Sequence, residues 1–262
     1  MDIETYPTDV PVLPPPFVAA ATMALFLDID GTLVDFAARP DAVVVEPALR
    51  TLLERLHGES GGALALVSGR SLAGIDDLIG LPRIAAAGLH GAEIRHADGR
   101  VDDARADASR LVRLRGALLA VADSLPAGVL VEDKGAALAL HWRNAPGAAA
   151  VVRHLADALL REAGDGFELQ PGQCVVEIKP AGTDKGDALA RLMRTPPFAG
   201  RTPWMFGDDL TDEHAFARAN ELGGVSVIVG ARRPTLARHA LADPRAARAW
   251  LADLAAPHEE ER

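Results

Sequence analysis

Residues 25–36 read LFLDIDGTLVDF and place two aspartates at the end of a short apolar run. The run before Asp28 and Asp30 is typical of a buried parallel strand, and Gly31 and Thr32 then mark a turn. A buried carboxylate is rarely left without a metal, a partner or a chemical task. The stretch therefore predicts a reactive site at the end of the first strand of the fold.

The chain after this stretch alternates helical and apolar segments. Residues 46–57 carry leucines at helical spacing, residues 63–67 form a second apolar run, and a third strand is expected within residues 83–95. The same alternation returns from residue 185 onward. This order is typical of an α/β protein, so we predict a core built on a Rossmann-like, doubly wound parallel sheet.

The middle of the chain has a different pattern. Two stretches between residues 100 and 180 alternate polar with apolar side chains, as antiparallel strands with one covered face do. We therefore expect an inserted α+β cap domain at residues 100–180 and a core domain formed by residues 21–99 and 181–262. Residues 1–20 are rich in proline, and we expect them to form a flexible leader.

Composition narrows the possible partners and location of the protein. The 262 residues carry a formal net charge of −10, and no basic stripe would attract nucleic acid. Cys174 is the only cysteine, which excludes an internal disulfide and is compatible with a reducing cytoplasm. No apolar stretch reaches the ~18 residues of a membrane span. We expect a cytoplasmic protein without membrane or nucleic-acid partners, as a monomer or weak homo-oligomer.

Polar residues follow three of the predicted strands, and a lysine begins a predicted helix. Besides the first aspartate pair, Ser68 follows the second strand, Asp208 and Asp209 follow the apolar run PWMF, and Lys185 follows Gly182-Thr183-Asp184. Ligands of open parallel sheets bind at the carboxyl ends of the strands, so we expect these groups to converge. Carboxylates that hold Mg²⁺, together with an ammonium and a hydroxyl, suit phosphoryl transfer.

Each of these signals also has a simpler explanation when taken alone. Ser68 could cap the following helix, the acids after PWMF could favour a helix N-terminus, and Lys185 could be an ordinary surface residue. A serine hydrolase is disfavoured because Leu66 occupies the first glycine position of a G-x-S-x-G elbow. No phosphate-binding P-loop motif occurs either. The four signals in this order favour phosphoryl transfer.

The segments DIDGTLVDF, LVSGR, TDKGDAL and GDDLTDE resemble the four ordered motifs of the haloacid dehalogenase superfamily of phosphatases. The resemblance implies a core of that type, with Asp28 as the nucleophile that forms an aspartyl-phosphate. It implies that Asp30 is the general acid and base. It further implies that Mg²⁺ is bound by the Asp28 side chain, the Asp30 backbone carbonyl and the Asp208 side chain. Phosphate would be bound by Ser68, Gly69 and Lys185. Asp209 and Asp212 would support the metal site or reach the metal through water.

Alternation in the cap places Ala139, His141 and Arg143 on one face of a strand, and Glu177 and Lys179 on one face of another. Periodicity alone is better explained by an ordinary solvated face than by a binding surface. However, GLHGAEIR, VEDKGAALALHWRNAP, PGQCVVEIKPAGTDKG and FGDDLTDEHAF resemble the trehalose-6-phosphate phosphatase family, and the resemblance covers residues 24–230.

In that family the insertion is a lid over the phosphate site. Carried over by motif, the resemblance implies substrate contacts from Arg70, His90, Gly91, Lys134, His141, Arg143, Glu177 and Lys179. Lys179 is a departure, because many relatives have arginine there, and a lysine lacks the bidentate fork.

The resemblance implies a phosphoric monoester hydrolase that acts in trehalose biosynthesis and releases trehalose and phosphate from trehalose 6-phosphate, a small-molecule sugar phosphate, with Mg²⁺ as cofactor. One alternative is a related lidded phosphatase for sucrose 6-phosphate or mannosyl-3-phosphoglycerate. Another is a non-catalytic module that binds a sugar phosphate. The non-catalytic module is disfavoured because the nucleophile and the metal-ligand residues are all present.

Overall fold

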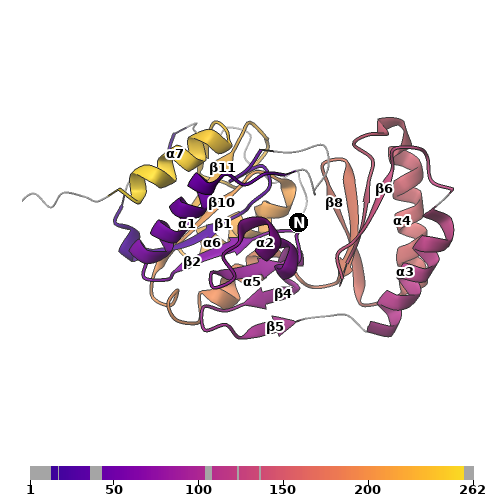
Figure 1. The fold of residues 1–262 in the computed structure, drawn as a ribbon, viewed down its shortest axis with the longest axis horizontal. Helices are drawn as coiled ribbons and strands as arrows, with labels where there is room; N and C mark the ends of the chain where they lie inside the picture. Colours follow the sequence, from indigo (N-terminus) through magenta and orange to yellow (C-terminus); the bar gives the residue numbers. More distant parts are fainter. Residues whose placement is uncertain are drawn as a thin grey trace, which may run out of the picture.

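The protein folds into two lobes that lie side by side (Figure 1). The computed structural model describes residues 13–16, 18–35, 43–103, 108–122, 124–135 and 137–256. Segments from both ends of the described chain form the larger lobe, and the middle of the chain forms the smaller one. The predicted α/β core with an inserted α+β cap is confirmed. Within the described residues, no helix has both the length and the apolar character needed to span a membrane.

An eight-stranded sheet forms the centre of the core, in the spatial order β12-β11-β10-β1-β2-β3-β4-β5. The strands from β12 to β3 are parallel, and β4 and β5 are antiparallel additions at one edge. The strands are β1 (Met23–Leu27), β2 (Leu64–Val67), β3 (Ala85–Gly88), β4 (Glu93–Arg95), β5 (Val101–Asp103), β10 (Thr202–Gly207), β11 (Val225–Val229) and β12 (His239–Leu241).

Helices cover both faces of this sheet, which explains why every residue of β1 is buried. Leu25 and Leu27 face one apolar cluster, and Ala24 and Phe26 face the other. The first cluster includes residues of α1 (Pro47–Glu59), α2 (Leu72–Ile79) and α7 (Pro244–Leu254), and the second includes residues of α5 (Lys185–Leu192) and α6 (Glu213–Glu221). Short 3₁₀ helices are η2 (Ala20–Thr22), η4 (Leu89–Gly91), η5 (Pro146–Ala148) and η6 (Leu210–Asp212).

The cap is a four-stranded antiparallel sheet, in the order β6-β7-β9-β8, with two helices on the side away from the core (Figure 1). Its elements are α3 (Ala108–Ala122), β6 (Leu130–Asp133), β7 (Leu138–His141), α4 (Ala149–Ala163), β8 (Phe167–Gly172) and β9 (Val175–Pro180). Leu138, Leu140 and Ile178 pack in one apolar cluster with residues of both helices. The apolar face predicted for these strands therefore faces the helices, and the polar face is turned toward the core.

Two local predictions differ from the structure. The stretch 83–95, expected as one strand, is divided into β3, η4 and β4, because Leu89, His90 and Gly91 all have positive φ (49°, 56° and 101°) and reverse the chain. The cap, expected to start at residue 100, begins after β5, which pairs with β4 in the core sheet. Residues 104–107, between β5 and α3, lie outside the described residues.

The described part of the predicted leader contacts the core. The carbonyl of Leu13 accepts a hydrogen bond from the Ala240 N–H (3.1 Å), and Trp250 Nε1 donates to the carbonyl of Pro15 (3.3 Å). Pro15 is buried. Residues 13–16 are therefore bound along β12 and α7, where we expected a flexible segment, and residues 1–12 lie outside the described residues.

Replacing Trp250 by alanine should lower the free energy of unfolding of the core by about 3–5 kcal/mol. Trp250 is 5% exposed, stacks on Trp204 with ring centroids 5.7 Å apart, and contacts Phe206 at 5.4 Å. Urea unfolding followed by circular dichroism would measure the change. Leu222→Ala, at a residue 47% exposed, is the control and should change stability by no more than about 0.5 kcal/mol. Equal losses in both variants would contradict this account of the core.

Candidate active site

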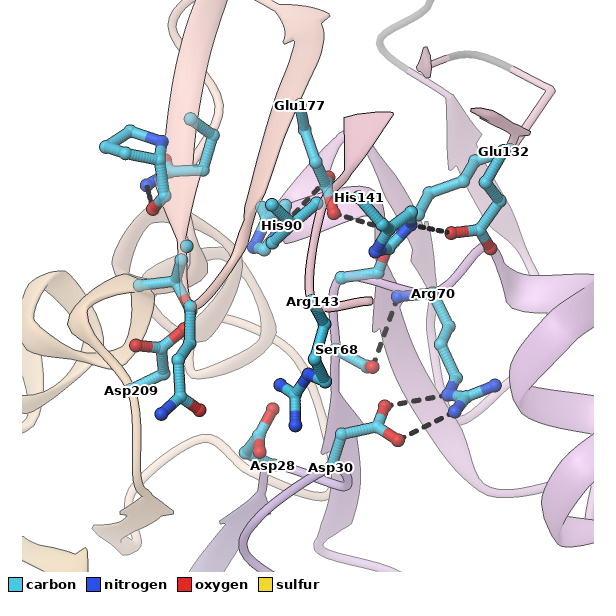
Figure 2. A pocket seen from close by; sticks show the side chains of 18 of the residues that line it. Asp28, Asp30, Ser68, Arg70, His90, Glu132, His141, Arg143, Glu177 and Asp209 are labelled. Carbon is cyan, nitrogen blue, oxygen red and sulfur yellow. Dashed lines mark hydrogen bonds and ion pairs between the residues drawn. The ribbon is translucent and has the colours of Figure 1, made fainter. Parts of the chain in front are cut away.

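A cavity between the two lobes contains most of the predicted site residues (Figure 2). The core contributes Asp28, Asp30, Ser68, Gly69, Arg70, His90, Lys185, Asp208 and Asp209, and the cap contributes Lys134, His141, Arg143 and Glu177. The chain thus encloses one space with carboxylates and a lysine on the core side and paired polar groups on the cap side.

Strand order brings the core groups together. β1 lies between β2 and β10 in the sheet, and all three run parallel. Asp28 follows β1, Ser68 follows β2 and Asp208 follows β10, so their carboxyl ends share one edge. The backbone N–H of Asp28 donates to the carbonyl of Phe206 (3.0 Å), which continues the β1–β10 pairing up to the site. The predicted convergence at this edge is observed.

Lys185 links two of the buried carboxylates. Its Nζ donates to Asp28 Oδ1 at 2.7 Å and to Asp212 Oδ1 at 2.6 Å. The three residues are between 0% and 4% exposed, so water cannot solvate the charges. Asp184 caps α5 by accepting the Asp187 N–H, and this cap sets the direction of the first helical turn, where Lys185 lies. One ammonium thus has two carboxylates as partners, and a negative charge remains.

The remaining charge shifts the proton affinities of the site. Burial raises the pKa of Asp28 to about 7, with Lys185 opposing and Asp212 adding to the shift. Burial and the charges of Asp28 and Asp212 raise the pKa of Asp208 to about 9. Desolvation lowers the pKa of Lys185, but the two carboxylates outweigh it and hold that pKa above its ordinary value. The carboxylates therefore need another cation if all of them are to be charged at neutral pH.

The donor atoms of this cluster fit a hard divalent cation. Carboxyl oxygens of Asp28, Asp208 and Asp212 lie within 4.8 Å of one another, and Mg²⁺ prefers such oxygen ligands. Asp212 is already engaged by the protein, because its Oδ2 accepts the N–H groups of Asp208 (2.9 Å) and Asp209 (3.0 Å). Asp28 and Asp208 are therefore the better candidates for direct ligands, and Asp212 supports Lys185 and the loop.

The GDD sequence folds tightly around the Asp212 side chain. Asp209 and Asp212 form a capping box at η6, and Asp209 Oδ1 accepts the Leu210 N–H at 2.7 Å. A Cβ atom at Gly207 would lie 2.3 Å from Cγ of Asp212, so only glycine fits at this position. The loop therefore requires both Gly207 and the acid five residues after it.

Ser68 is a site residue and does not cap the following helix. The cap of α2 is Ser71, whose Oγ accepts the Gly74 N–H at 3.1 Å. Ser68 is 1% exposed, and its Oγ accepts the Arg70 N–H at 3.2 Å. The capping alternative is thus wrong for Ser68, and its hydroxyl hydrogen can be donated toward the cavity.

Arg70 binds the second aspartate of the first motif through both of its oxygens. Its Nε and Nη2 donate to Asp30 Oδ2 and Oδ1, each at 2.7 Å (Figure 2). Desolvation opposes the charge of Arg70, but the hydrogen bond and charge of Asp30 keep the pKa of Arg70 above its ordinary value. Arg70 was predicted to contact the substrate, and it lines the cavity while it holds Asp30. Such a bidentate pair fixes the plane of the carboxylate.

The cap is joined to the core by a chain of buried charges. Lys134 donates to the carbonyl of Gly69 (3.0 Å) and pairs with Glu177, whose other oxygen lies 3.1 Å from His90 Nε2. Burial would raise the pKa of Glu177, but Lys134 and His90 hold it well below the usual range. Burial lowers the pKa of His90 more strongly than Glu177 raises it. These contacts bring the cap onto the loop that carries Ser68.

Some cavity residues were not predicted. Glu132 Oε2 lies 2.8 Å from His141 Nε2, and both line the cavity (Figure 2). Alternation along β6 could have indicated Glu132, because it lies on the same face as Lys134. Gln170 and Gln173, near the tip of the β8–β9 hairpin, also line the cavity. No sequence signal distinguishes these two amides from ordinary loop residues.

Two predicted substrate contacts lie away from the cavity lining. Lys179 is fully buried, and its Nζ binds the Glu168 carboxylate and the Thr183 carbonyl, so it secures the second crossing between cap and core. Gly91 has a φ of 101°, and a Cβ there would lie 2.5 Å from the Asp184 carbonyl oxygen. Gly91 therefore permits close packing of η4 against the start of α5.

Without metal, the substitution Asp208→Asn should stabilise the protein increasingly as the pH rises. The pKa of Asp208 is about 9 in the folded protein, and its ordinary value is 3.8. At a pH between these two values, the folded protein therefore holds a proton on Asp208 that the unfolded protein does not. Unfolding free energy then falls with rising pH in that window, and asparagine removes this loss. We expect an advantage of about 1–2 kcal/mol at pH 8.5 that shrinks toward pH 5.

Thermal or urea unfolding in EDTA at several pH values would measure this difference. Asp77→Asn, at an exposed position on α2, is the matched control and should give no pH-dependent advantage. A difference between the wild type and Asp208→Asn that stays constant from pH 5 to 8.5 would contradict the charge balance described for this site.

Comparison with known sequences identifies close relatives. Residues 26–245 match the trehalose-phosphatase family. A probable trehalose-phosphate phosphatase of Sinorhizobium fredii is 50% identical over 207 residues, which cover 79% of this chain and 77% of the relative. A trehalose-6-phosphate phosphatase of Escherichia coli is 43% identical over 211 residues, which cover 80% of this chain and 79% of the relative.

Solved structures share the fold. The C-terminal domain of the trehalose-6-phosphate phosphatase of C. albicans superposes with a TM-score of 0.75 at 23% identity, covering 90% of this chain and 93% of that one. A phosphatase of the haloalkanoate (HAD) enzyme superfamily from Bacteroides thetaiotaomicron superposes with a TM-score of 0.57 at 16% identity. The superposition covers 92% of this chain and 97% of that one. The predicted fold type is confirmed, and with the family match over residues 26–245 this chain belongs to the trehalose-phosphatase family.

Proposed function

We propose that this protein is a Mg²⁺-dependent phosphatase that hydrolyses trehalose 6-phosphate to trehalose and inorganic phosphate. Its family consists of phosphoric monoester hydrolases. The observation that carries the proposal is the single cavity in which the Asp28–Lys185–Asp208 cluster of the core faces the polar side of the cap. The relatives from S. fredii and E. coli, a probable trehalose-phosphate phosphatase and a trehalose-6-phosphate phosphatase, support this choice of substrate.

Asp28 would act as the nucleophile. Lys185 binds its Oδ1, so Oδ2 is the atom that would attack phosphorus, forming an aspartyl-phosphate as the bond from phosphorus to the sugar oxygen breaks. Asp30 would give a proton to that leaving oxygen and later take one from the water that hydrolyses the intermediate. To reach the leaving oxygen, Asp30 has to exchange part of its contact with Arg70 for a contact with the substrate.

The remaining core groups would hold the transferring phosphoryl group. Lys185, the Ser68 hydroxyl and the backbone of Gly69 line the cavity and would bind its oxygens, which would stabilise charge in the transition state. The Asp28 and Asp208 side chains and the Asp30 carbonyl would hold Mg²⁺, which offsets the negative charge of phosphate and carboxylates. Asp209 would reach the cation through water, and Asp212 would keep Lys185 and the loop in place.

The cap would select the sugar. Hydroxyl groups both donate and accept hydrogen bonds, so carboxylates and cations that face each other across a cavity suit them. Glu177 contacts both Lys134 and His90, and Glu132 contacts His141, so sugar hydroxyls would replace these contacts on binding. Arg143, at the end of β7, lines the same space. Trehalose biosynthesis in the cytoplasm, by a monomer or weak homo-oligomer, is the setting we infer.

Phosphate release from a panel of substrates tests the proposed reaction. With Mg²⁺ present, trehalose 6-phosphate should be hydrolysed in preference to sucrose 6-phosphate, mannosyl-3-phosphoglycerate, glucose 6-phosphate and p-nitrophenyl phosphate. Asp28→Asn should lower the rate by at least about 10³-fold because the nucleophile is lost. Equal rates on all sugars would refute the assigned specificity, and full activity of Asp28→Asn would refute the nucleophile.

A second test separates the cap from the chemistry. Lys134→Gln should lower kcat/KM for trehalose 6-phosphate about 10- to 100-fold, since a charged hydrogen bond to substrate is lost. The rate with p-nitrophenyl phosphate should stay within about threefold, because that substrate has no distal sugar. Arg161→Gln, at an exposed position on the outer helix α4, is the control and should change neither. Parallel losses on both substrates would contradict a sugar-binding role.

A further inference from the structure

Arg232 and Glu213 form a charged pair that has no role in the proposed reaction. Glu213 begins α6 and its side chain is 1% exposed, while Arg232 lies in the loop after β11 and is 26% exposed. A carboxylate buried this deeply is strongly destabilising unless it is paired and hydrogen bonded. Glu213 is the last residue of the motif GDDLTDE, but the motif assigns it no role, and Arg232 lies outside the motifs. Neither residue lines the sugar-facing cavity.

The guanidinium of Arg232 joins three separate segments. Its Nη2 binds Glu213 Oε1, its Nη1 donates to the carbonyl of Pro234 (3.1 Å), and its Nε donates to the carbonyl of Asp208 (3.1 Å). The other oxygen of Glu213 accepts the Leu236 N–H at 2.7 Å. The carboxylate thereby fixes both the guanidinium plane and the loop that carries it.

Asp208 is consequently restrained at three points. Its N–H donates to Asp212 Oδ2 (2.9 Å), its Oδ1 accepts from Thr32 Oγ1 (3.2 Å), and its carbonyl accepts from Arg232. The first two partners belong to the motif loops, whereas Arg232 is 24 positions further along the chain. Repulsion from Asp28 and Asp212 would drive the Asp208 carboxylate away from the cluster, and these restraints oppose that movement.

We propose that Arg232 is a positioning residue for the cation site, because its bond to the Asp208 carbonyl holds the Asp208 carboxylate near Asp28. The inference rests on the cation site of the proposed function, and concerns binding of the ion independently of the substrate. A ligand that is already in place loses less conformational freedom on binding, so residues behind the ligands raise metal affinity. Glu213 acts on the cation site only through Arg232, because it orients the guanidinium of that residue.

Isothermal titration of the full chain with Mg²⁺ tests the proposal. Arg232→Gln should weaken Mg²⁺ binding about 3- to 10-fold, which is less than the roughly 10- to 100-fold effect of removing groups that bind a ligand side chain, because Arg232 binds only the backbone of Asp208. Arg232→Lys keeps the charge beside Glu213 but loses the planar set of donors, so its Kd should lie between those of Arg232→Gln and the wild type. Phosphatase activity should recover at high Mg²⁺, because the carboxylates themselves are intact.

Arg238→Gln, an exposed arginine in the same loop, is the control and should bind Mg²⁺ like the wild type. A wild-type Kd in Arg232→Gln, with only a lowered melting temperature, would overturn the proposal in favour of a purely structural pair. If that variant does not fold, a wild-type Kd in Arg232→Lys overturns it equally. Absence of Mg²⁺ binding in the wild type would refute the cation site and this inference together. Weakened binding in Arg232→Gln, in a protein inert toward trehalose 6-phosphate, would refute only the substrate.

Discussion

The structure of the site depends on the contact of one buried ammonium with two buried carboxylates. Lys185 binds Asp28 and Asp212 in a region that is almost completely buried, and one charge among them remains unbalanced. Asp208, at the next strand end, adds to this excess. An isolated buried charge is strongly destabilising, so the arrangement is favourable only with a further cation or with a bound proton. The same excess of negative charge is the reason why this cluster suits the cation of the proposed function.

The cap meets the core through a second set of buried charges. In this set the positive charge of Lys134 balances the negative charge of Glu177. Glu177 pairs with both Lys134 and His90, and Lys134 also binds the backbone of the loop that carries Ser68. The Glu177 carboxylate therefore has a partner at each oxygen, whereas His90 Nδ1 is buried without a hydrogen-bond partner among the described residues.

Much of the core site could be predicted because each residue is tied to a strand end or a helix start. Asp28, Ser68 and Asp208 lie where the motifs indicated, since strand order brings them together, and Lys185 joins them from the start of α5. Contacts between residues distant in sequence were harder to predict. Lys179 was expected to contact the substrate but binds Glu168, and no motif indicated that Arg232 binds Asp208. Alternation predicts the face on which a side chain lies, but the partner it meets there comes from a segment distant in sequence.

The sequence by itself determined the doubly wound core, the inserted cap and the four motif positions, because these follow from local periodicity and short motifs. Only the tertiary structure decided that β5 belongs to the core, that Ser71 caps α2 in place of Ser68, and that Arg70 holds Asp30. It also decided how Asp208 is restrained by Arg232. The physical reason is that hydrogen bonds and ion pairs between distant segments depend on distances of a few ångströms, and those are set by the packing of the whole chain.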